Sequence, residues 1–231
     1  IIRNGVGFDT VDIAAAAQAG IAVCNVPDYG TEEVADHAIA LTLALYRQLF
    51  PLDAEAKRLG WKIETAAKMR RLSTQTFGVL GLGRIGTATA LRAKAMGFRT
   101  IFFDPYVPSG THKAIGVERV SSLEELLRRA DTLSVHCPLT AETRGIIGAQ
   151  EIALMKPGSY VVNTARGDIV QKAPVFAALR SDDKTALARR MDPQGLITIH
   201  NRMDPAAPKI LFVPVAKHLE NWLKSPPGLD E

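Results

Sequence analysis

Residues 76–104, TFGVLGLGRIGTATALRAKAMGFRTIFFD, decide the fold. The largely apolar residues 76–80 predict a strand, the glycines that follow predict a tight turn, and the Ala-rich residues up to Met96 predict a helix. Residues 98–103 then predict a second strand, which ends at Asp104. A strand, a glycine turn, a helix and another strand form a βαβ unit, so the sequence predicts an α/β protein built on a parallel sheet.

The glycine turn has the spacing of a dinucleotide-binding site. Gly81 suits the tight turn, Gly83 lets a pyrophosphate approach the backbone, and Gly86 lets the helix pack closely on the strand. Asp104, at the end of the next strand, is placed to accept hydrogen bonds from an adenosine ribose. Because this carboxylate repels a 2′-phosphate, the expected cofactor is NAD rather than NADP. The pattern predicts a Rossmann-type, doubly wound parallel sheet.

Composition excludes several other classes of protein. Of 231 residues, 47% are hydrophobic and 23% are charged, which is typical of a globular protein and argues against disorder, collagen-like repeats and coiled coils. The net charge of +4 comes from scattered residues, and the arginine pairs lack interleaved aromatics. We therefore expect no direct nucleic-acid partner.

The length of the apolar runs and the number of cysteines indicate where the protein is located and whether it binds a metal. No apolar run approaches the roughly 20 residues that cross a bilayer, and no secretory signal is present, so we expect a cytoplasmic protein without a membrane partner. Cys24 and Cys137 are too few for a disulfide framework or a zinc site, which predicts two buried, reduced thiols and no metal. Because the chain begins with Ile1, we expect a fragment or a chain trimmed at its start.

Two further helices have predicted starts. Thr31 is predicted to cap a long helix that extends to about Leu49, and residues 50–75 are predicted to connect two domains. Ser121, with Glu124 three residues later, has the pattern of a capping box and predicts the start of another helix.

Polar and reactive residues follow three predicted strands, at 98–103, 132–136 and 160–163. They are Asp104, the run His136-Cys137-Pro138 and the run Thr164-Ala165-Arg166. In an open parallel sheet, ligands bind beyond the carboxyl ends of the strands. We therefore expect these residues to share one site.

The chain resembles the D-isomer-specific 2-hydroxyacid dehydrogenases and, within them, the branch that contains the C-terminal-binding-protein corepressors. The matching segments cover most of residues 1–171, and they include GVGFDTVDIAAAAQAGIAVCNVP, GVLGLGRIGTATALRAKAMGF, SSLEELLRRADTLSVHCPLT and MKPGSYVVNTARGDIV. The resemblance implies two α/β domains with NAD in the cleft between them, and a homodimer formed through the cofactor domain.

The resemblance also implies a division of the chain. Residues 1–30 are the remnant of a flavodoxin-like substrate domain, and residues 31–75 form the linking helix and connection. Residues 76–215 form the NAD-binding domain, which diverges from the family after about residue 172. Residues 216–231 form a tail.

Individual site residues follow from the same resemblance. Arg84 and Ile85 contact the pyrophosphate, together with Gly81, Gly83 and Gly86, and Asp104 binds the ribose. The residues expected on the adenosine side and along the rest of the cofactor path are His136, Cys137, Pro138, Thr143, Thr164 and Ala165. The loop that contains Gly5, Val6 and Gly7 offers backbone N–H groups to the substrate carboxylate.

The family's chemistry is hydride transfer between NAD(H) and a 2-hydroxy or 2-oxo acid. Arg166, in the sequence NTARG, matches the arginine that binds the substrate carboxylate and polarises its carbonyl, a task for which a planar guanidinium is suited. The family's Glu and His have no equivalents at the matching positions, which hold Gln194 or Gly195 and Val215. His218 is the better of two histidines that could substitute.

Two functions are therefore expected. The first is an NAD-dependent oxidoreductase of the D-2-hydroxyacid dehydrogenase type, and the sequence does not define its substrate side chain. The alternative is a non-catalytic, corepressor-like dimerisation module that binds NAD(H), which would place the protein in the nucleus.

Overall fold

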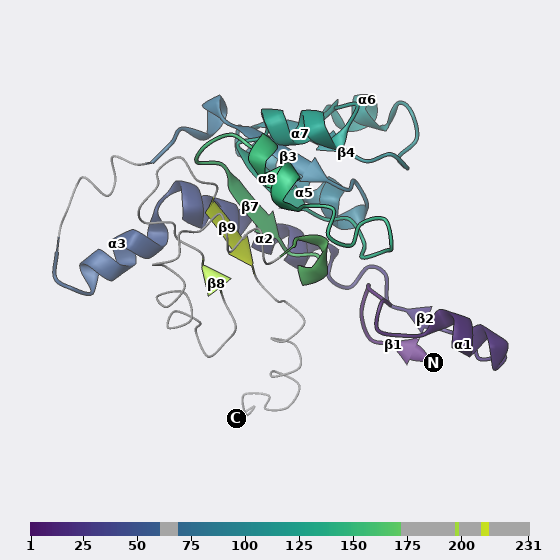
Figure 1. The fold of residues 1–231 in the computed structure, drawn as a ribbon. Coiled ribbons are helices and arrows are strands. Elements are labelled where there is room, and N and C mark those ends of the chain that lie inside the picture. Colours follow the sequence, from purple (N-terminus) through teal and green to yellow (C-terminus); the bar gives the residue numbers. More distant parts are fainter. Residues whose placement is uncertain (61–68, 172–196, 199–208, 213–231) are drawn as a thin grey trace.

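A seven-stranded sheet forms the centre of the computed structural model, which describes residues 1–60, 69–171, 197–198 and 209–212 (Figure 1). The strand order is β5-β4-β3-β6-β7-β9-β8. Its strands are β3 (Thr76–Leu80), β4 (Arg99–Phe103), β5 (Glu118–Arg119), β6 (Thr132–Val135), β7 (Tyr160–Asn163), β8 (Ile197–Thr198) and β9 (Lys209–Phe212). Every pairing is parallel except that of β8 with β9.

Helices cover both faces of this sheet. They are α2 (Thr31–Tyr46), α5 (Arg84–Ala95), α6 (Thr111–Ile115), α7 (Leu123–Arg129) and α8 (Ala149–Leu154), with the short 3-10 turns η1 (Leu72–Thr74) and η2 (Gly167–Ile169). α3 (Leu49–Ala56) follows α2 and extends away from the sheet (Figure 1).

The strand residues alternate between two cores. Phe77 and Val79 of β3 belong to a buried cluster with residues of α2 and α5, whereas Leu80 belongs to a second cluster with Leu126 and Leu127 of α7. Side chains of a strand point alternately to opposite faces, so a sheet covered on both sides buries both sets. The prediction of a Rossmann-type, doubly wound parallel sheet is confirmed.

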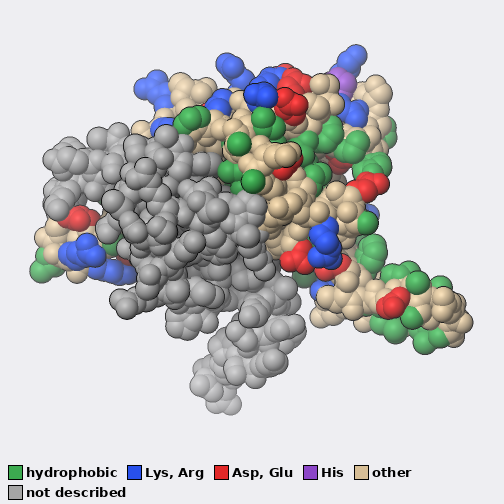
Figure 2. All heavy atoms as spheres, viewed as in Figure 1, with side chains coloured by type: hydrophobic (Ala, Val, Ile, Leu, Met, Phe, Trp, Pro, Cys, Tyr) green, Lys and Arg blue, Asp and Glu red, His purple; other side chains and the backbone are tan. Residues whose placement is uncertain are grey.

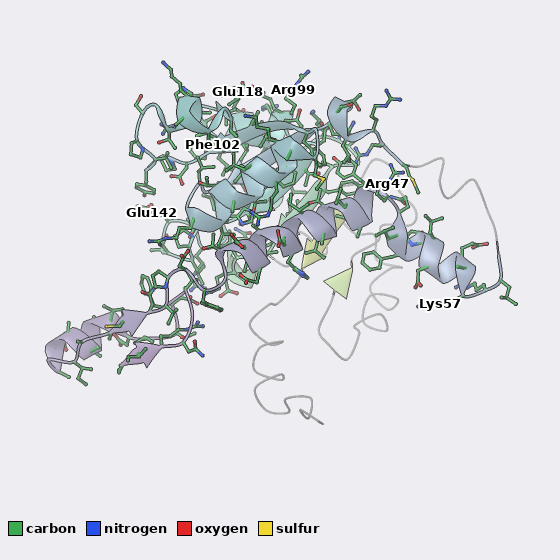
Figure 3. The ribbon with its side chains drawn as sticks, turned by 180° about the vertical axis from the view of Figure 1, so that it is seen from behind. Arg47, Lys57, Arg99, Phe102, Glu118 and Glu142 are labelled. Atoms are coloured by element: carbon green, nitrogen blue, oxygen red, sulfur yellow. The ribbon has the colours of Figure 1, made fainter. Side chains whose placement is uncertain are left out.

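The helix α2 is part of the core rather than a connection outside it. The ring of Tyr46 is fully buried and packs edge-on against Tyr160, and its hydroxyl accepts a hydrogen bond from Thr132 at 3.0 Å. The guanidinium of Arg70 lies over both tyrosine rings and donates to the carbonyl oxygen of Gly158 at 3.0 Å. Figure 3 shows α2 alongside α5 from behind. The labels Arg47 and Lys57 mark the residues that directly follow α2 and α3.

A small unit at the N-terminus stands apart from the sheet (Figure 1). It contains β1 (Ile2–Arg3), α1 (Ile13–Gln18) and β2 (Cys24–Asn25), and its two strands pair in parallel. Large apolar side chains are exposed on it, and Figure 2 shows several of them over its surface. They are Ile1, Ile2, Phe8, Ile13, Ile21 and Tyr29. An exposed apolar surface of this kind is typical of an interaction surface.

Helix starts differ from the predictions by one residue. Gly30, not Thr31, occupies the N-cap of α2, and the Thr31 hydroxyl donates to the Asp28 carboxylate at 3.0 Å. At α7 the cap is Ser122, whose hydroxyl accepts from the backbone N–H of Glu125 at 3.1 Å. At α7 two adjacent serines compete for one cap, whereas at α2 the cap is a glycine and no side chain fills it.

Two other expectations are corrected. The predicted helix to Leu49 ends at Tyr46, because Gln48 has a left-handed backbone with φ of 52°. A separate helix, α3, begins at Leu49 and occupies the start of the predicted connection. Cys24 is exposed rather than buried, while Cys137 is buried as expected.

No helix in the described ranges combines the length and the apolar character that a bilayer crossing requires.

Candidate cofactor and substrate site

Four strands of the sheet end in register. Their last residues pair side by side in the order Phe103, Leu80, Val135 and Asn163. The residues that follow these ends are Asp104, Gly81, His136 and Thr164. The structure therefore brings the predicted residues to one edge of the sheet.

The centre of this edge is the point where the order of the strands reverses. From β3 the chain proceeds through β4 and β5 on one side, and then returns to β6 and β7 on the other. Ligands of open α/β sheets bind at such a switch point, outside the carboxyl ends of the strands. The glycine turn after β3 and residues 136–138 after β6 lie on its two sides.

Gly81 and Gly86 permit contacts that no other residue would allow. Gly81 has φ of +90°, and a Cβ atom there would lie 2.7 Å from the backbone nitrogen of Cys137. A Cβ atom on Gly86 would lie 2.0 Å from the carbonyl oxygen of Gly81. A Cβ atom on Gly83, by contrast, would meet no atom within 4 Å, so this glycine faces open space.

The helix α5 begins at the open side of this turn. Gly83 is its N-cap, and no side chain caps it. The first N–H groups of a helix have no acceptor within the helix, and the helix dipole favours an anion beside them. Arg84 is exposed and Ile85 is half-buried in the first turn. The backbone thus offers donors and space where a pyrophosphate needs them.

Asp104 ties the glycine turn to the end of β4. One carboxylate oxygen accepts from the backbone N–H of Leu82 at 2.7 Å, and the other accepts from that of Tyr106 at 2.9 Å. Arg119, which sequence reasoning did not consider, donates to the carbonyl oxygen of Asp104 at 2.9 Å. A cation therefore lies beside the expected ribose position, although Asp104 itself carries a negative charge there.

A hydrogen bond from the Tyr106 hydroxyl to the Glu142 carboxylate joins the loops after β4 and β6. The bond raises the pKa of Tyr106 above its ordinary value, because the phenol is the proton donor to an anion. These two loops flank the end of β3, so the contact bridges the centre of the edge. Figure 3 places Glu142 on the side of the molecule nearest the N-terminal unit.

His136 and Cys137 are both uncharged at neutral pH. Enclosure by the protein lowers the pKa of His136 to about 4, and its Nε2 lies 2.8 Å from the hydroxyl of Ser134. Burial raises the pKa of Cys137 to about 11. Thr143 joins this loop, since its hydroxyl donates to the carbonyl oxygen of Pro138 at 2.5 Å. His136 and Cys137 are therefore not an acid/base pair at neutral pH.

The loop after β7 presents a free hydroxyl. The Thr164 hydroxyl oxygen is buried and has no hydrogen-bond partner among the described residues, which is unusual for a buried polar group. Asn163 shapes this loop, because its side chain accepts from the N–H of Ala165 at 3.0 Å and donates to the carbonyl oxygen of Arg166 at 2.9 Å. Sequence reasoning missed Asn163, although an asparagine at a strand end is a signal for such a turn.

Arg166 meets the N-terminal unit. Its Nη2 lies 2.8 Å from a carboxylate oxygen of Asp9, and a Cβ atom on Gly7 would lie 1.6 Å from the same nitrogen. The hydrogen bond and charge of Arg166 hold the pKa of Asp9 below its usual value. Nearby, the carbonyl oxygen of Val6 accepts from the Asn25 side chain at 2.8 Å, and the N–H of Gly5 donates to the carbonyl oxygen of Arg3 at 2.9 Å. The structure thus brings the loop 5–7 to Arg166.

The positions that match the family's Glu and His lie outside the described ranges. They hold Gln194 or Gly195 and Val215, and the substitute candidate His218 lies outside these ranges too. Between these positions, β9 is described and pairs with β7. In the part of the chain that the structure describes, no three His, Cys, Asp or Glu side chains are grouped to hold a metal ion.

These features fit a dinucleotide. The open space at Gly83 leaves room for a pyrophosphate beside free helix N–H groups, and Asp104 follows the end of β4. Further along the same edge, the buried Thr164 hydroxyl has no hydrogen-bond partner among the described residues and can donate to or accept from a ligand.

Residues 39–189 match the family described as "D-isomer specific 2-hydroxyacid dehydrogenase, NAD binding domain". The chain belongs to this family. It is 41% identical over 186 residues to D-3-phosphoglycerate dehydrogenase of Methanocaldococcus jannaschii, covering 80% of this chain and 35% of that protein. It is 39% identical over 187 residues to C-terminal-binding protein 1 of Caenorhabditis elegans, covering 78% and 26% respectively. The chain thus spans about a third or less of these curated relatives.

Solved structures of the family have the same fold. D-lactate dehydrogenase of Aquifex aeolicus, complexed with NAD and lactic acid, is 35% identical with a TM-score of 0.70, and the match covers 77% of this chain and 53% of that one. D-mandelate dehydrogenase of Rhodotorula graminis is 33% identical with a TM-score of 0.71, covering 78% and 55%. The predicted family resemblance is confirmed, and the sheet described above is the family's NAD-binding domain.

Proposed function

We propose that the chain is the cofactor-binding part of an NAD-dependent oxidoreductase that transfers a hydride between NAD(H) and a 2-hydroxy or 2-oxo acid. One observation carries this proposal. The glycine turn, Asp104, His136 and Thr164 follow four strand ends that lie in register, and Arg166 meets the loop 5–7 next to them. A cofactor site and a carboxylate-binding arginine are therefore adjacent.

The roles proposed along the cofactor follow the order of the strands. The N–H groups at Gly83, Arg84 and Ile85 bind the pyrophosphate, with Gly81 and Gly86 shaping the turn. Asp104 binds the adenosine ribose, and the neutral segment of His136, Cys137 and Pro138 lies against the adenosine, held by Thr143. Thr164 and Ala165 continue the path toward Arg166.

Arg166 and the loop 5–7 bind the substrate in this proposal. The guanidinium binds the carboxylate and polarises the adjacent carbonyl, because it remains charged and presents its donors in a plane. Backbone N–H groups of Gly5, Val6 and Gly7 add donors from the opposite side. Bound NADH supplies the hydride.

Reduction of a 2-oxo acid also requires a residue that donates a proton to the product oxygen. The family's Glu and His correspond to Gln194 or Gly195 and Val215, none of which transfers a proton at neutral pH. His218 is the candidate in this chain for the acid that protonates the product oxygen. If it fills that role, replacing it with Gln abolishes turnover without weakening NADH binding.

The alternative function is a non-catalytic NAD(H)-binding module of the corepressor kind. The replacement of both the Glu and the His favours it, as does the similarity to C-terminal-binding protein 1. Such a module binds cofactor and dimerises without turnover. We propose a homodimer for either function, in the cytoplasm for the enzyme and in the nucleus for the module.

The experiment that separates the two functions is NADH oxidation by the purified chain with pyruvate or glyoxylate. The oxidoreductase predicts turnover that Arg166→Ala abolishes, while Arg144→Ala, which breaks an exposed ion pair with Asp168, leaves it intact. Saturable NADH binding without turnover by any 2-oxo acid would favour the module. In that case Gln194→Glu combined with Val215→His is the variant expected to gain activity.

A further inference from the structure

Arg166 is held from the side by a carboxylate of the N-terminal unit. Its Nε donates to both oxygens of Asp9, at 2.9 and 3.1 Å, and its Nη2 lies 2.8 Å from one of them. The two side chains are 33% and 25% exposed, so water screens the pair less than it screens a surface pair. Nη1 donates to the carbonyl oxygen of Ala165 at 3.0 Å.

The remaining donors of Arg166 match the proposed substrate. A guanidinium has five N–H donors, one on Nε and two on each terminal nitrogen. The contacts with Asp9 and Ala165 use the Nε donor, one donor of Nη2 and one of Nη1. One donor remains on each terminal nitrogen, which is the number that a bidentate carboxylate requires. Asp9 therefore fixes the guanidinium without using up its capacity to bind an anion.

The substrate loop approaches the same nitrogen. Gly7 lies so close to Nη2 that a Cβ atom would overlap it, at 1.6 Å. Gly7 and Asp9 are separated by one residue, so a single loop supplies both the carboxylate that orients Arg166 and the backbone predicted to bind the substrate anion. The position of Arg166 and that of the substrate loop are thereby coupled.

The ion pair also joins the two parts of the molecule. Within the described ranges, Asp9 and Arg166 form the one ion pair between residues 1–30 and residues 69–171. The N-terminal unit otherwise stands apart from the sheet (Figure 1).

We propose that Asp9 is a positioning residue for Arg166: it orients the guanidinium across the cleft so that the two free terminal donors face the substrate carboxylate. This role rests on the proposed function. It requires that the loss of Asp9 weaken binding of a 2-oxo acid but not binding of NADH, because Asp9 contacts none of the residues at the glycine turn.

The first test observes the ion pair directly and requires no activity. In the ¹⁵N-labelled chain, the Nε–H signal of Arg166 is identified by its loss in Arg166→Lys. We expect this signal to exchange slowly with water and to lose that protection in Asp9→Asn. The control, Asp168→Asn, removes the carboxylate that pairs with Arg144 and leaves the signal unchanged. A signal that Asp9→Asn does not alter would overturn the proposal.

The second test measures the consequence for the substrate. Oxamate, an unreactive analogue of pyruvate, is titrated into the NADH-loaded chain. Misplacing a binding group by about 1 Å costs up to about a hundredfold, so we expect Asp9→Asn to weaken oxamate binding by about tenfold or more, Asp9→Glu to restore part of the loss, and Asp168→Asn to have no effect. NADH affinity stays within about twofold in every variant.

The outcomes separate this proposal from the proposed function. Equal oxamate affinity in the unmodified chain and in Asp9→Asn would overturn the positioning role. If the unmodified chain binds NADH but no oxamate, the proposed substrate class is wrong. The role of Asp9 in binding that substrate then fails as well. The Nε–H signal of Arg166 still reports whether Asp9 orients the guanidinium.

Discussion

Gly86 lies so close to Gly81 that a Cβ atom on Gly86 would be 2.0 Å from the carbonyl oxygen of Gly81. The contact packs the first turn of α5 against the end of β3. We predict that Gly86→Ala lowers the free energy of unfolding by about 1 to 3 kcal/mol, because the backbone of Gly81 leaves no room for a methyl group. Urea unfolding followed by circular dichroism measures this change.

Gly83→Ala is the matched control for that variant. A methyl group at Gly83 meets no atom within 4 Å, so the stability is expected to change by less than about 0.5 kcal/mol. NADH binding is expected to weaken, since the methyl group occupies the open side of the turn. If the two variants destabilise the chain equally, the packing account of Gly86 is wrong.

The choice between NADH and NADPH is predicted to depend on Asp104. Asp104→Asn keeps an acceptor for a backbone N–H but removes the charge that repels a 2′-phosphate, and Arg119 lies beside the same position. We expect the ratio of the NADPH and NADH dissociation constants to fall by about tenfold, measured by fluorescence titration. In the double variant Asp104→Asn with Arg119→Ala, we expect the ratio of the two dissociation constants to return toward that of the unmodified chain. An unchanged ratio would show that Asp104 does not select the ribose.

Stability is predicted to fall as the pH decreases below 7. The pKa of His136 is about 4 in the folded chain and near 6.5 when the ring is exposed, so the unfolded chain takes up the proton first. Stability from the neutral ring is complete above pH 6.5 and is lost as the pH falls toward 4, by up to about 2 kcal/mol at pH 5. The measurement is the urea midpoint at pH 8 and pH 5.

His136→Gln provides the comparison, with His112→Gln as the control for removing a histidine elsewhere. The dependence on pH between 8 and 5 should become shallower in His136→Gln alone. Equal slopes in all three proteins would mean that water reaches the ring of His136.

The two cysteines are predicted to react at different rates. Cys24 is exposed, whereas Cys137 is buried with its pKa raised to about 11, and only a thiolate reacts with a disulfide reagent. At pH 8 we expect one thiol to react rapidly, and that fast phase to disappear in Cys24→Ser. A fast phase that persists in Cys24→Ser would show that the segment after β6 opens in solution.

The periodic part of the sequence predicted the fold well. The run from Thr76 to Asp104 contains every feature of its βαβ unit, because short apolar runs and glycine spacing are local signals. The polar residues after three strands were also found to share one edge, since parallel strands carry their carboxyl ends to the same side.

The contacts between distant segments were not predictable in the same way. Asp9 and Arg166 are 157 residues apart in sequence, and no local pattern reports that they meet. The bond from Tyr106 to Glu142 and the position of Arg119 beside Asp104 likewise depend on how loops after different strands approach each other. The helix α3 was not predicted, because most of its eight residues were interpreted as part of a longer connection and include Pro51, which is not typical of a helix interior.

The most direct test of the account is a fluorescence titration of the purified chain with NADH, with NADPH titrated in parallel. We predict saturable NADH binding and at least tenfold weaker NADPH binding, because the glycine turn receives the pyrophosphate and Asp104 repels a 2′-phosphate. An absence of saturable NADH binding, or equal affinity for the two cofactors, would contradict the proposed site.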